Sequence, residues 1–124
     1  MATPNLLTNT SMVPGILVSE KITVTTDSAV YTVAAGHAVK LAQGTIANIS
    51  GAACTVGLSL VQSGGTVGDG THKIIPDTYS LGASDTLPLG DFIKDHVMGD
   101  GDIIAVHAGA ANALDVVISG YVMS

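Results

Sequence analysis

Apolar residues recur at every second position along much of this chain, which is the period of a half-buried β-strand. The pattern is clearest in the segments 54–62 and 114–123. In the first, the residues expected to face inward are Cys54, Val56, Leu58 and Leu60, and those expected to face outward are Thr55, Gly57 and Ser59. In the second, Leu114, Val116, Ile118 and Val122 are expected on one face, and Asp115, Val117, Ser119 and Tyr121 on the other.

Shorter apolar segments between turn residues predict the remaining strands. These are 16–25, 29–33, 37–49 with a bulge at Gly44, 72–75, 79–81, 86–89, 92–98 and 102–108. The glycine-rich segment 63–71 is expected to be a surface loop, and Gly99-Asp100-Gly101 a tight hairpin turn. No segment sustains a helical period, so we predict an all-β fold: an antiparallel β-sandwich or jelly-roll-like barrel of about 8–10 short strands.

The first 15 residues interrupt this pattern and are expected to form an extended N-terminal arm, followed by a sandwich domain over 16–124. Prolines and a glycine punctuate the segment, and no strand or helix period is sustained. Its apolar residues are Leu6, Leu7, Met12 and Val13. A frayed terminus is one interpretation; the other, which we favour, is an arm that docks on a neighbouring subunit.

Charge is unusually scarce. Only 11% of residues are charged, against about 25% in ordinary soluble domains. A small-residue surface of Thr and Ser is one explanation, but the cores of protein interfaces are also depleted in charge, and we favour an assembly subunit. The uncharged outward positions expected to contact other subunits, together with the arm, are Thr55, Ser59, Val117, Ser119 and Tyr121.

The charge balance also argues against some partners. The net charge is −6, and the four lysines are dispersed along the chain. Nucleic-acid and anionic-membrane binding both depend on clustered basic residues, so we expect neither. The uncharged segment 41–68 is broken by polar residues, so no transmembrane helix is predicted, and no secretory leader is apparent. A single cysteine, Cys54, excludes an intramolecular disulfide.

The sequence carries no specific catalytic, cofactor-binding or metal-binding signal. The four histidines, His37, His72, His96 and His107, are scattered without short ligand spacing, although strands could still bring them together. The acidic glycine turns at 68–70 and 99–102 lack the pattern of a calcium loop and are typical of turn chemistry. Cys54 is expected on an inward face, where a thiol is unreactive. We therefore predict a non-enzymatic protein that needs no cofactor.

Four segments show a distinctive order of strand and turn residues: Val30-Tyr31-Thr32-Val33-Ala34-Ala35-Gly36, ANISGAACTVGLSLVQSGGTVGDGTHKIIPD, LGASDTLPL and MGDGDIIAVHAGAANALDVVISGYV. In these segments the chain resembles a group of small β-sandwich proteins from bacteriophage particles. The resemblance covers most of residues 29–122, and its motifs are strand and turn patterns. Members of this group are head decoration, head fibre or tail-associated proteins, so the resemblance implies a virion component and no catalytic residues.

From the resemblance and the scarce charge we expect a capsid decoration (cement) protein on the exterior of a phage head, assembled in the host cytoplasm. Its expected partners are further copies of itself, as a homotrimer, and the major capsid protein. The alternative is a tail- or fibre-associated module that binds a receptor or glycan. That alternative would be favoured if the aromatic residues Tyr31, Tyr79, Phe92 and Tyr121 converged on one loop end.

Overall fold

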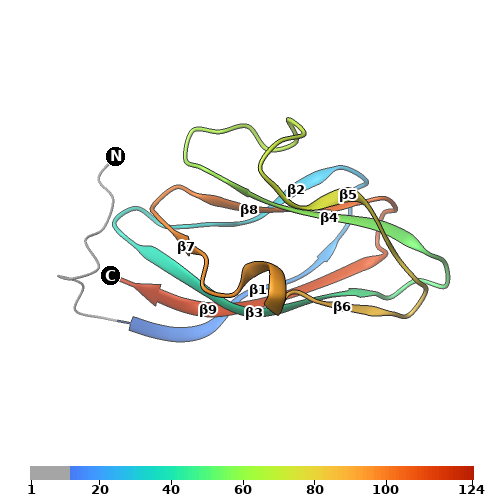
Figure 1. The fold of residues 1–124 in the computed structure, drawn as a ribbon, viewed down its shortest axis with the longest axis horizontal. Helices are drawn as coiled ribbons and strands as arrows, with labels where there is room; N and C mark the ends of the chain where they lie inside the picture. The colour runs from blue at the N-terminus through green and yellow to red at the C-terminus, as the bar shows by residue number, and fades with distance from the viewer. Residues whose placement is uncertain (1–11) are drawn as a thin grey trace.

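The chain folds into two antiparallel β-sheets that pack face to face (Figure 1). The structure is a computed structural model, and it describes residues 12–124. Its strands are β1 (Met12–Ile22), β2 (Asp27–Thr32), β3 (Ala38–Asn48), β4 (Cys54–Val61), β5 (Lys73–Leu81), β6 (Thr86–Pro88), β7 (Val97–Met98), β8 (Ile103–Ala108) and β9 (Leu114–Met123). One short helix, α1 (Gly90–Ile93), lies between β6 and β7. The predicted all-β sandwich is confirmed.

The order of the strands is that of a jelly roll. One sheet has the order β1-β9-β3-β6, with β7 also paired to β3, and the other has the order β2-β8-β4-β5. The pairs β1·β9, β2·β8, β3·β6 and β4·β5 are nested, as in one long antiparallel hairpin rolled up on itself. Pairing of β3 with β9 and of β4 with β8 then completes the two sheets, which is the architecture of a double-sheet jelly roll.

The core lies between the sheets and consists mainly of Val, Ile and Leu. On β9 the fully buried residues Val116 and Ile118 alternate with outward residues, and on β4 Val56 and Leu58 do the same from the opposite sheet. This alternation confirms the inward faces predicted for both strands. Burial of such a side chain contributes about 1.5–3 kcal/mol, so the shared core is the main source of stability.

The first strand begins earlier than predicted. β1 starts at Met12 and pairs with the last strand from the outset, with Met12 opposite Met123 and Val13 opposite Val122. Met12 and Val13 therefore belong to the edge strand of the sandwich and not to an arm. The predicted arm otherwise falls on residues 1–11, which lie outside the described residues.

The strand predicted over 92–98 is wrong, because most of that segment forms α1 and a loop, and only Val97 and Met98 pair with β3. Leu89 and Ile93 are fully buried, and α1 lies between the edges of the two sheets (Figure 1). The helical turn and its preceding residue place these two side chains in the core between β6 and β7. No helix within residues 12–124 combines the length and apolar character needed to cross a membrane.

The turn at Gly99-Asp100-Gly101 is a crossing between the sheets rather than the predicted hairpin. It joins β7 in the five-stranded sheet to β8 in the four-stranded sheet. The Asp100 carboxylate accepts a hydrogen bond from the Gly36 N–H, and Asp102 accepts from the N–H groups of Gly99 and Ser63. Acidic residues are needed here because they satisfy backbone donors of neighbouring connections.

Two further differences concern bulges. The bulge predicted at Gly44 lies at Ala42, between Leu41 and Gln43. The strands predicted over 72–75 and 79–81 are one strand, β5, which continues past Pro76 through irregular pairing with β4. Because β5 is an edge strand, the missing N–H of Pro76 leaves no ladder hydrogen bond unmade.

The buried side chain of Asn48 joins three parts of the chain at the end of β3. Its Nδ2 donates to the carbonyls of Ala52 and Leu81, and its Oδ1 accepts from the N–H and the hydroxyl of Ser50. These bonds fix the β3–β4 turn against the last residue of β5. A polar side chain that is only 1% exposed is tolerated here because both ends of its amide have partners.

Candidate functional site

The outer face of the five-stranded sheet brings together three of the predicted interface residues. Val117, Ser119 and Tyr121 alternate on β9 with core residues and therefore point away from the core. In register beside them lie residues of β1 and β3, and directly opposed residues share a face. We call the following uncharged set the neutral face: Pro14, Ile16, Ser19, Gln43, Thr45, Val117, Ser119 and Tyr121. The charged Lys40 of β3 lies opposite Tyr121 and ends the set on that side.

No residue of the neutral face is charged, and the charges at its borders are balanced. Lys21 lies opposite Asp115 at one end, and Lys40 forms an exposed ion pair with Asp95 at 3.4 Å at the other. Two shallow hollows of about 280 and 300 Å³ flank Ser119. The larger hollow is lined by Pro14, Ile16 and Tyr121, among others, and Ile16 is 69% exposed.

The remaining predicted interface residues lie elsewhere. Met12 and Val13 are exposed at the start of β1, beside the neutral face. Leu6 and Leu7 lie outside the described residues. Thr55 is half-buried on β4, in the other sheet, so the predicted set is divided between the outer faces of the two sheets, which point in opposite directions.

Ser59, which was predicted to face outward and to contact another subunit, is buried, with an exposure of 3%. Ser59 does point outward from β4, between Lys73 on β5 and Ala105 on β8. The Lys73 side chain starts beside Ser59 and reaches Asp27 on β2, so it crosses the outer face of β4 and β8. A small residue at position 59 makes room for that lysine, and Ser59 is therefore unavailable to a partner.

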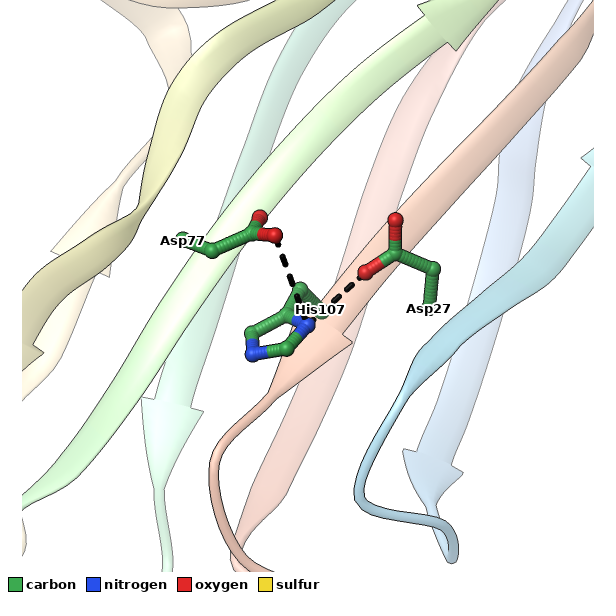
Figure 2. A group of neighbouring side chains, drawn as sticks. All are labelled: Asp27, Asp77 and His107. Carbon is green, nitrogen blue, oxygen red and sulfur yellow. Dashed lines mark hydrogen bonds and ion pairs between the residues drawn. The ribbon is translucent and has the colours of Figure 1, made fainter. Parts of the chain in front are cut away.

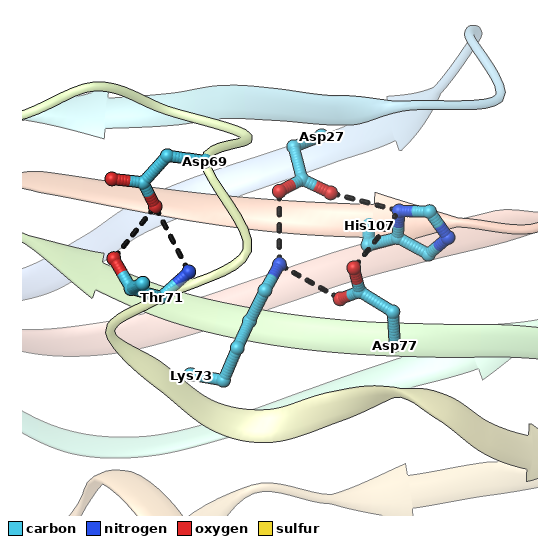
Figure 3. Close-up of polar contacts among 6 residues, drawn as sticks. All are labelled: Asp27, Asp69, Thr71, Lys73, Asp77 and His107. Atoms are coloured by element: carbon cyan, nitrogen blue, oxygen red, sulfur yellow. Dashed lines mark hydrogen bonds and ion pairs between the residues drawn. The ribbon is translucent and has the colours of Figure 1, made fainter.

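Lys73 is one of four charged or titratable residues that form a closed ring on the outer face of the four-stranded sheet (Figure 3). Its Nζ lies 2.9 Å from Asp27 Oδ2 and 2.8 Å from Asp77 Oδ1. The Nδ1 of His107 lies 2.8 Å from Asp27 Oδ1 and 3.6 Å from Asp77 Oδ2. Each carboxylate therefore places one oxygen on the lysine and the other toward the histidine. We call these four residues the ionic ring.

The pairing of the strands assembles the ionic ring from three strands. Asp27 on β2 lies opposite His107 on β8, which in turn lies opposite Gly57 on β4. Asp77 belongs to the irregular part of β5, beyond Gly57. A Cβ atom at Gly57 would overlap Asp77 Oδ1 and would lie 3.0 Å from Asp77 Cα. The glycine therefore leaves the gap through which β5 reaches the histidine across β4.

The contacts within the ionic ring shift the pKa values of Asp27 and Lys73, its most buried members. Desolvation by itself would raise the pKa of Asp27, but hydrogen bonds and charge from Lys73 and His107 outweigh it and hold that pKa below its ordinary value. Desolvation would likewise lower the pKa of Lys73, but bonding to Asp77 and Asp27 raises it above its ordinary value. The Asp27 side chain is only 8% exposed, so its charge depends on these partners.

A hollow of about 350 Å³ lies beside the ionic ring. Asp27, Asp77 and His107 line it together with Thr26, Val67, Gly68 and Gly70. The last three residues belong to the β4–β5 loop, which rises on the outer side of this sheet (Figure 1). Within that loop the Asp69 carboxylate accepts hydrogen bonds from the N–H and hydroxyl of Thr71 (Figure 3), so the acidic glycine turn at 68–70 uses its aspartate to close the turn.

The sequence did not predict this cluster. Asp27 and His107 are 80 positions apart, and only the strand register brings them together. Across residues 12–124, Asp27, Asp77 and His107 form the one group of potential metal ligands close enough to share an ion. His37, His72, His96 and Cys54 are not part of it. The available signal was Gly57, a residue without a side chain at an outward position of a regular strand.

The aromatic residues do not gather at one end of the molecule. Tyr121 lies on the neutral face and Tyr79 on β5 of the other sheet. Tyr31 on β2 and Phe92 in α1 pack against the core. The convergence that would favour a glycan-binding module is therefore not found.

Comparisons with protein-family models, with curated proteins and with solved structures find no match to this chain. The fold itself defines the class of the protein, a two-sheet antiparallel β-sandwich with jelly-roll strand order.

Proposed function

We propose that this chain is a non-enzymatic structural protein of a phage particle, a capsid decoration protein that binds the outside of the head as a homotrimer. The support comes from the sequence resemblance to small phage β-sandwich proteins, from the scarcity of charge and from the jelly-roll fold, an architecture that is common among viral capsid proteins. The neutral face carries the proposal, since it supplies a surface suited to burial against a shell.

The neutral face fits a protein partner because its desolvation leaves no charge unpaired. Burial of an isolated charge is strongly unfavourable, and Lys40, the charged residue opposite Tyr121, is paired with Asp95. The half-buried Val117 and the exposed Tyr121 and Ile16 offer apolar area, and the hollows beside Ser119 can accept side chains of the partner. A stable interface of this kind buries about 800 Å² per partner.

The edges of both sheets are poorly suited to association, which leaves the faces. β1 carries Pro14 and a bulge near Leu17, and β2 carries a bulge near Val30. β5 contains Pro76 and two irregularities in its pairing, while β6 is three residues long and ends in Pro88. Prolines, bulges and short strands are the features that prevent edge-to-edge pairing. These features favour association through a sheet face.

The net charge of −6 favours the exterior of a shell over its interior. Packaged DNA repels an acidic protein, and DNA binding needs the phosphate contacts that clustered basic residues supply. A trimer would also place three copies of the neutral face on one symmetric shell, so weak contacts would add through avidity. The major capsid protein is therefore the partner that we propose for the neutral face.

The proposal is tested by a charge placed at the centre of the neutral face. We expect Ser119→Lys to fold normally and to lower binding to particles that lack this protein by at least about tenfold, because the lysine would have to be desolvated on docking. Ser80→Lys is the matched control, since Ser80 is an exposed strand serine on β5 in the other sheet. Binding is measured by co-sedimentation of purified protein with the particles, and folding by circular dichroism.

Equal binding of the wild type and Ser119→Lys would contradict the role of the neutral face. A loss caused by Ser80→Lys alone would place the docking surface on the opposite sheet. Failure of the wild type itself to bind particles would contradict the proposed function.

A further inference from the structure

The ionic ring has the composition and geometry of a site for a transition-metal ion, which goes beyond the proposed function and does not depend on it. Two carboxylates and one imidazole converge from β2, β5 and β8 (Figure 2). One ligand atom from each residue lies within 4.8 Å of the other two. Histidine nitrogen and carboxylate oxygen are both ligands of Zn²⁺, at about 2.0–2.2 Å.

The distances between the candidate ligand atoms are near those of a four-coordinate ion. Tetrahedral ligands at this bond length are about 3.3 Å apart. His107 Nδ1 lies 2.8 Å from Asp27 Oδ1 and 3.6 Å from Asp77 Oδ2, so both pairs require shifts of only a few tenths of an ångström. The ligand oxygens of the two carboxylates lie within 4.8 Å of each other, and Asp77 can adjust its position because its side chain is 34% exposed and lies on the irregular part of β5.

Lys73 does not occupy the position that an ion would take. Its Nζ contacts Asp27 Oδ2 and Asp77 Oδ1, which are the carboxylate oxygens directed away from the histidine. The lysine therefore holds each carboxylate with its other oxygen toward His107 Nδ1 (Figure 3). Metal-ligating carboxylates are commonly oriented in this way by an outer hydrogen-bonding partner.

The hollow beside the ionic ring supplies the fourth position. Its volume is about 350 Å³, and the share of one water molecule in the liquid is about 30 Å³. The glycines that line it, Gly68 and Gly70, contribute no side chains that would fill the space. A metal-bound water could therefore complete the coordination.

We propose that Asp27, Asp77 and His107 bind one Zn²⁺ ion, which replaces the proton on His107 Nδ1 and has water as its fourth ligand. The ion would join the edge strands β2 and β5 to β8 across the outer face of the four-stranded sheet. Its role is structural: it would link the two edge strands of this sheet.

The test is isothermal titration of the full-length protein, freed of metal with EDTA and dialysed, with ZnCl₂. We expect one ion per chain and a higher thermal midpoint with Zn²⁺. His107→Gln retains a group that can donate to Asp27, and Asp77→Asn retains the shape of the side chain, so both should fold. Each should weaken Zn²⁺ binding by at least about 100-fold, because loss of an outer partner alone costs about 10–100-fold. His96→Ala, an exposed histidine outside the ring, is the matched control and should bind like the wild type.

Two results would overturn the proposal. The first is the absence of binding with a stoichiometry of one ion per chain, or unchanged binding by His107→Gln. The second is preferential binding of Ca²⁺ in the same titration, since calcium selects sites made of six to eight oxygen ligands and would not need the histidine. Neither result bears on binding to particles, so each of the two proposals, the metal site and the proposed function, can be contradicted without the other.

Discussion

The substitution Gly57→Ala tests how the ionic ring is built. The added methyl group would overlap the Asp77 carboxylate and would lie 3.0 Å from Asp77 Cα, so either β5 or Asp77 must move. Overpacking of this kind costs about 1–3 kcal/mol. Loss of the partly exposed ion pair between Asp77 and Lys73 adds about 0.2–1 kcal/mol. Replacement of a strand glycine by alanine returns about 0.5–1 kcal/mol.

The net expectation is that Gly57→Ala destabilises the fold by about 1–3 kcal/mol. Gly15→Ala is the matched control, since Gly15 also lies in a strand, on β1, and a Cβ there would meet nothing within 4 Å. We expect that variant to be as stable as the wild type or slightly more stable. Equilibrium unfolding in urea, followed by circular dichroism, measures both differences.

A double-mutant cycle with Asp77→Ala identifies the cause. If the carboxylate is the obstacle, Gly57→Ala should cost at least about 1 kcal/mol less in the Asp77→Ala background, because residues in contact do not act additively. The same cost in both backgrounds would show that the obstacle is the backbone of β5 at Asp77 and not its carboxylate. A stabilising effect of Gly57→Ala in the wild-type background would refute the steric account.

Two further predictions concern stability. The folded-state pKa of Asp27 lies below its ordinary value of 3.8, so the contribution of Asp27 to the free energy of unfolding is present above pH 3.8 and is lost as the pH falls through the lower folded-state pKa. Asp27→Asn should therefore reduce the slope of the unfolding free energy against pH in the acid range, measured in EDTA. An unchanged slope would contradict this linkage. Asn48→Ala should cost about 2–4 kcal/mol in urea unfolding, because the Leu81 carbonyl and the Ser50 N–H lose their partner, and a cost below about 0.5 kcal/mol would show that water replaces the amide.

The period of the apolar residues and the positions of the turn residues were sufficient to predict the sandwich and the faces of its most regular strands. On β9, the alternation of Val116 and Ile118 with Val117 and Ser119 matches the observed burial. The errors lie where tertiary contacts override local pattern. The apolar segment containing Phe92 and Ile93 favours a strand by composition, but it becomes one helical turn because Ile93 closes the core between the sheet edges.

The ionic ring could not be predicted because it depends on register. A shift of one residue between β2 and β8 would place Asp27 opposite a core residue instead of His107. The same limitation applies to Ser59. The prediction that its side chain faces outward was correct, but the sequence did not indicate that the side chain is buried. Nothing in the sequence near Ser59 indicates that Lys73, 14 positions later, lies opposite it on β5.

The number of copies per particle tests the proposed function most directly. Quantitative mass spectrometry of intact, purified particles gives the ratio of this chain to the major capsid protein. The account predicts hundreds of copies in a fixed ratio to the shell subunit, as expected for a decoration protein that covers the head. A ratio of only a few copies per particle would indicate a tail component, and the absence of the chain from particles would contradict a role in the virion.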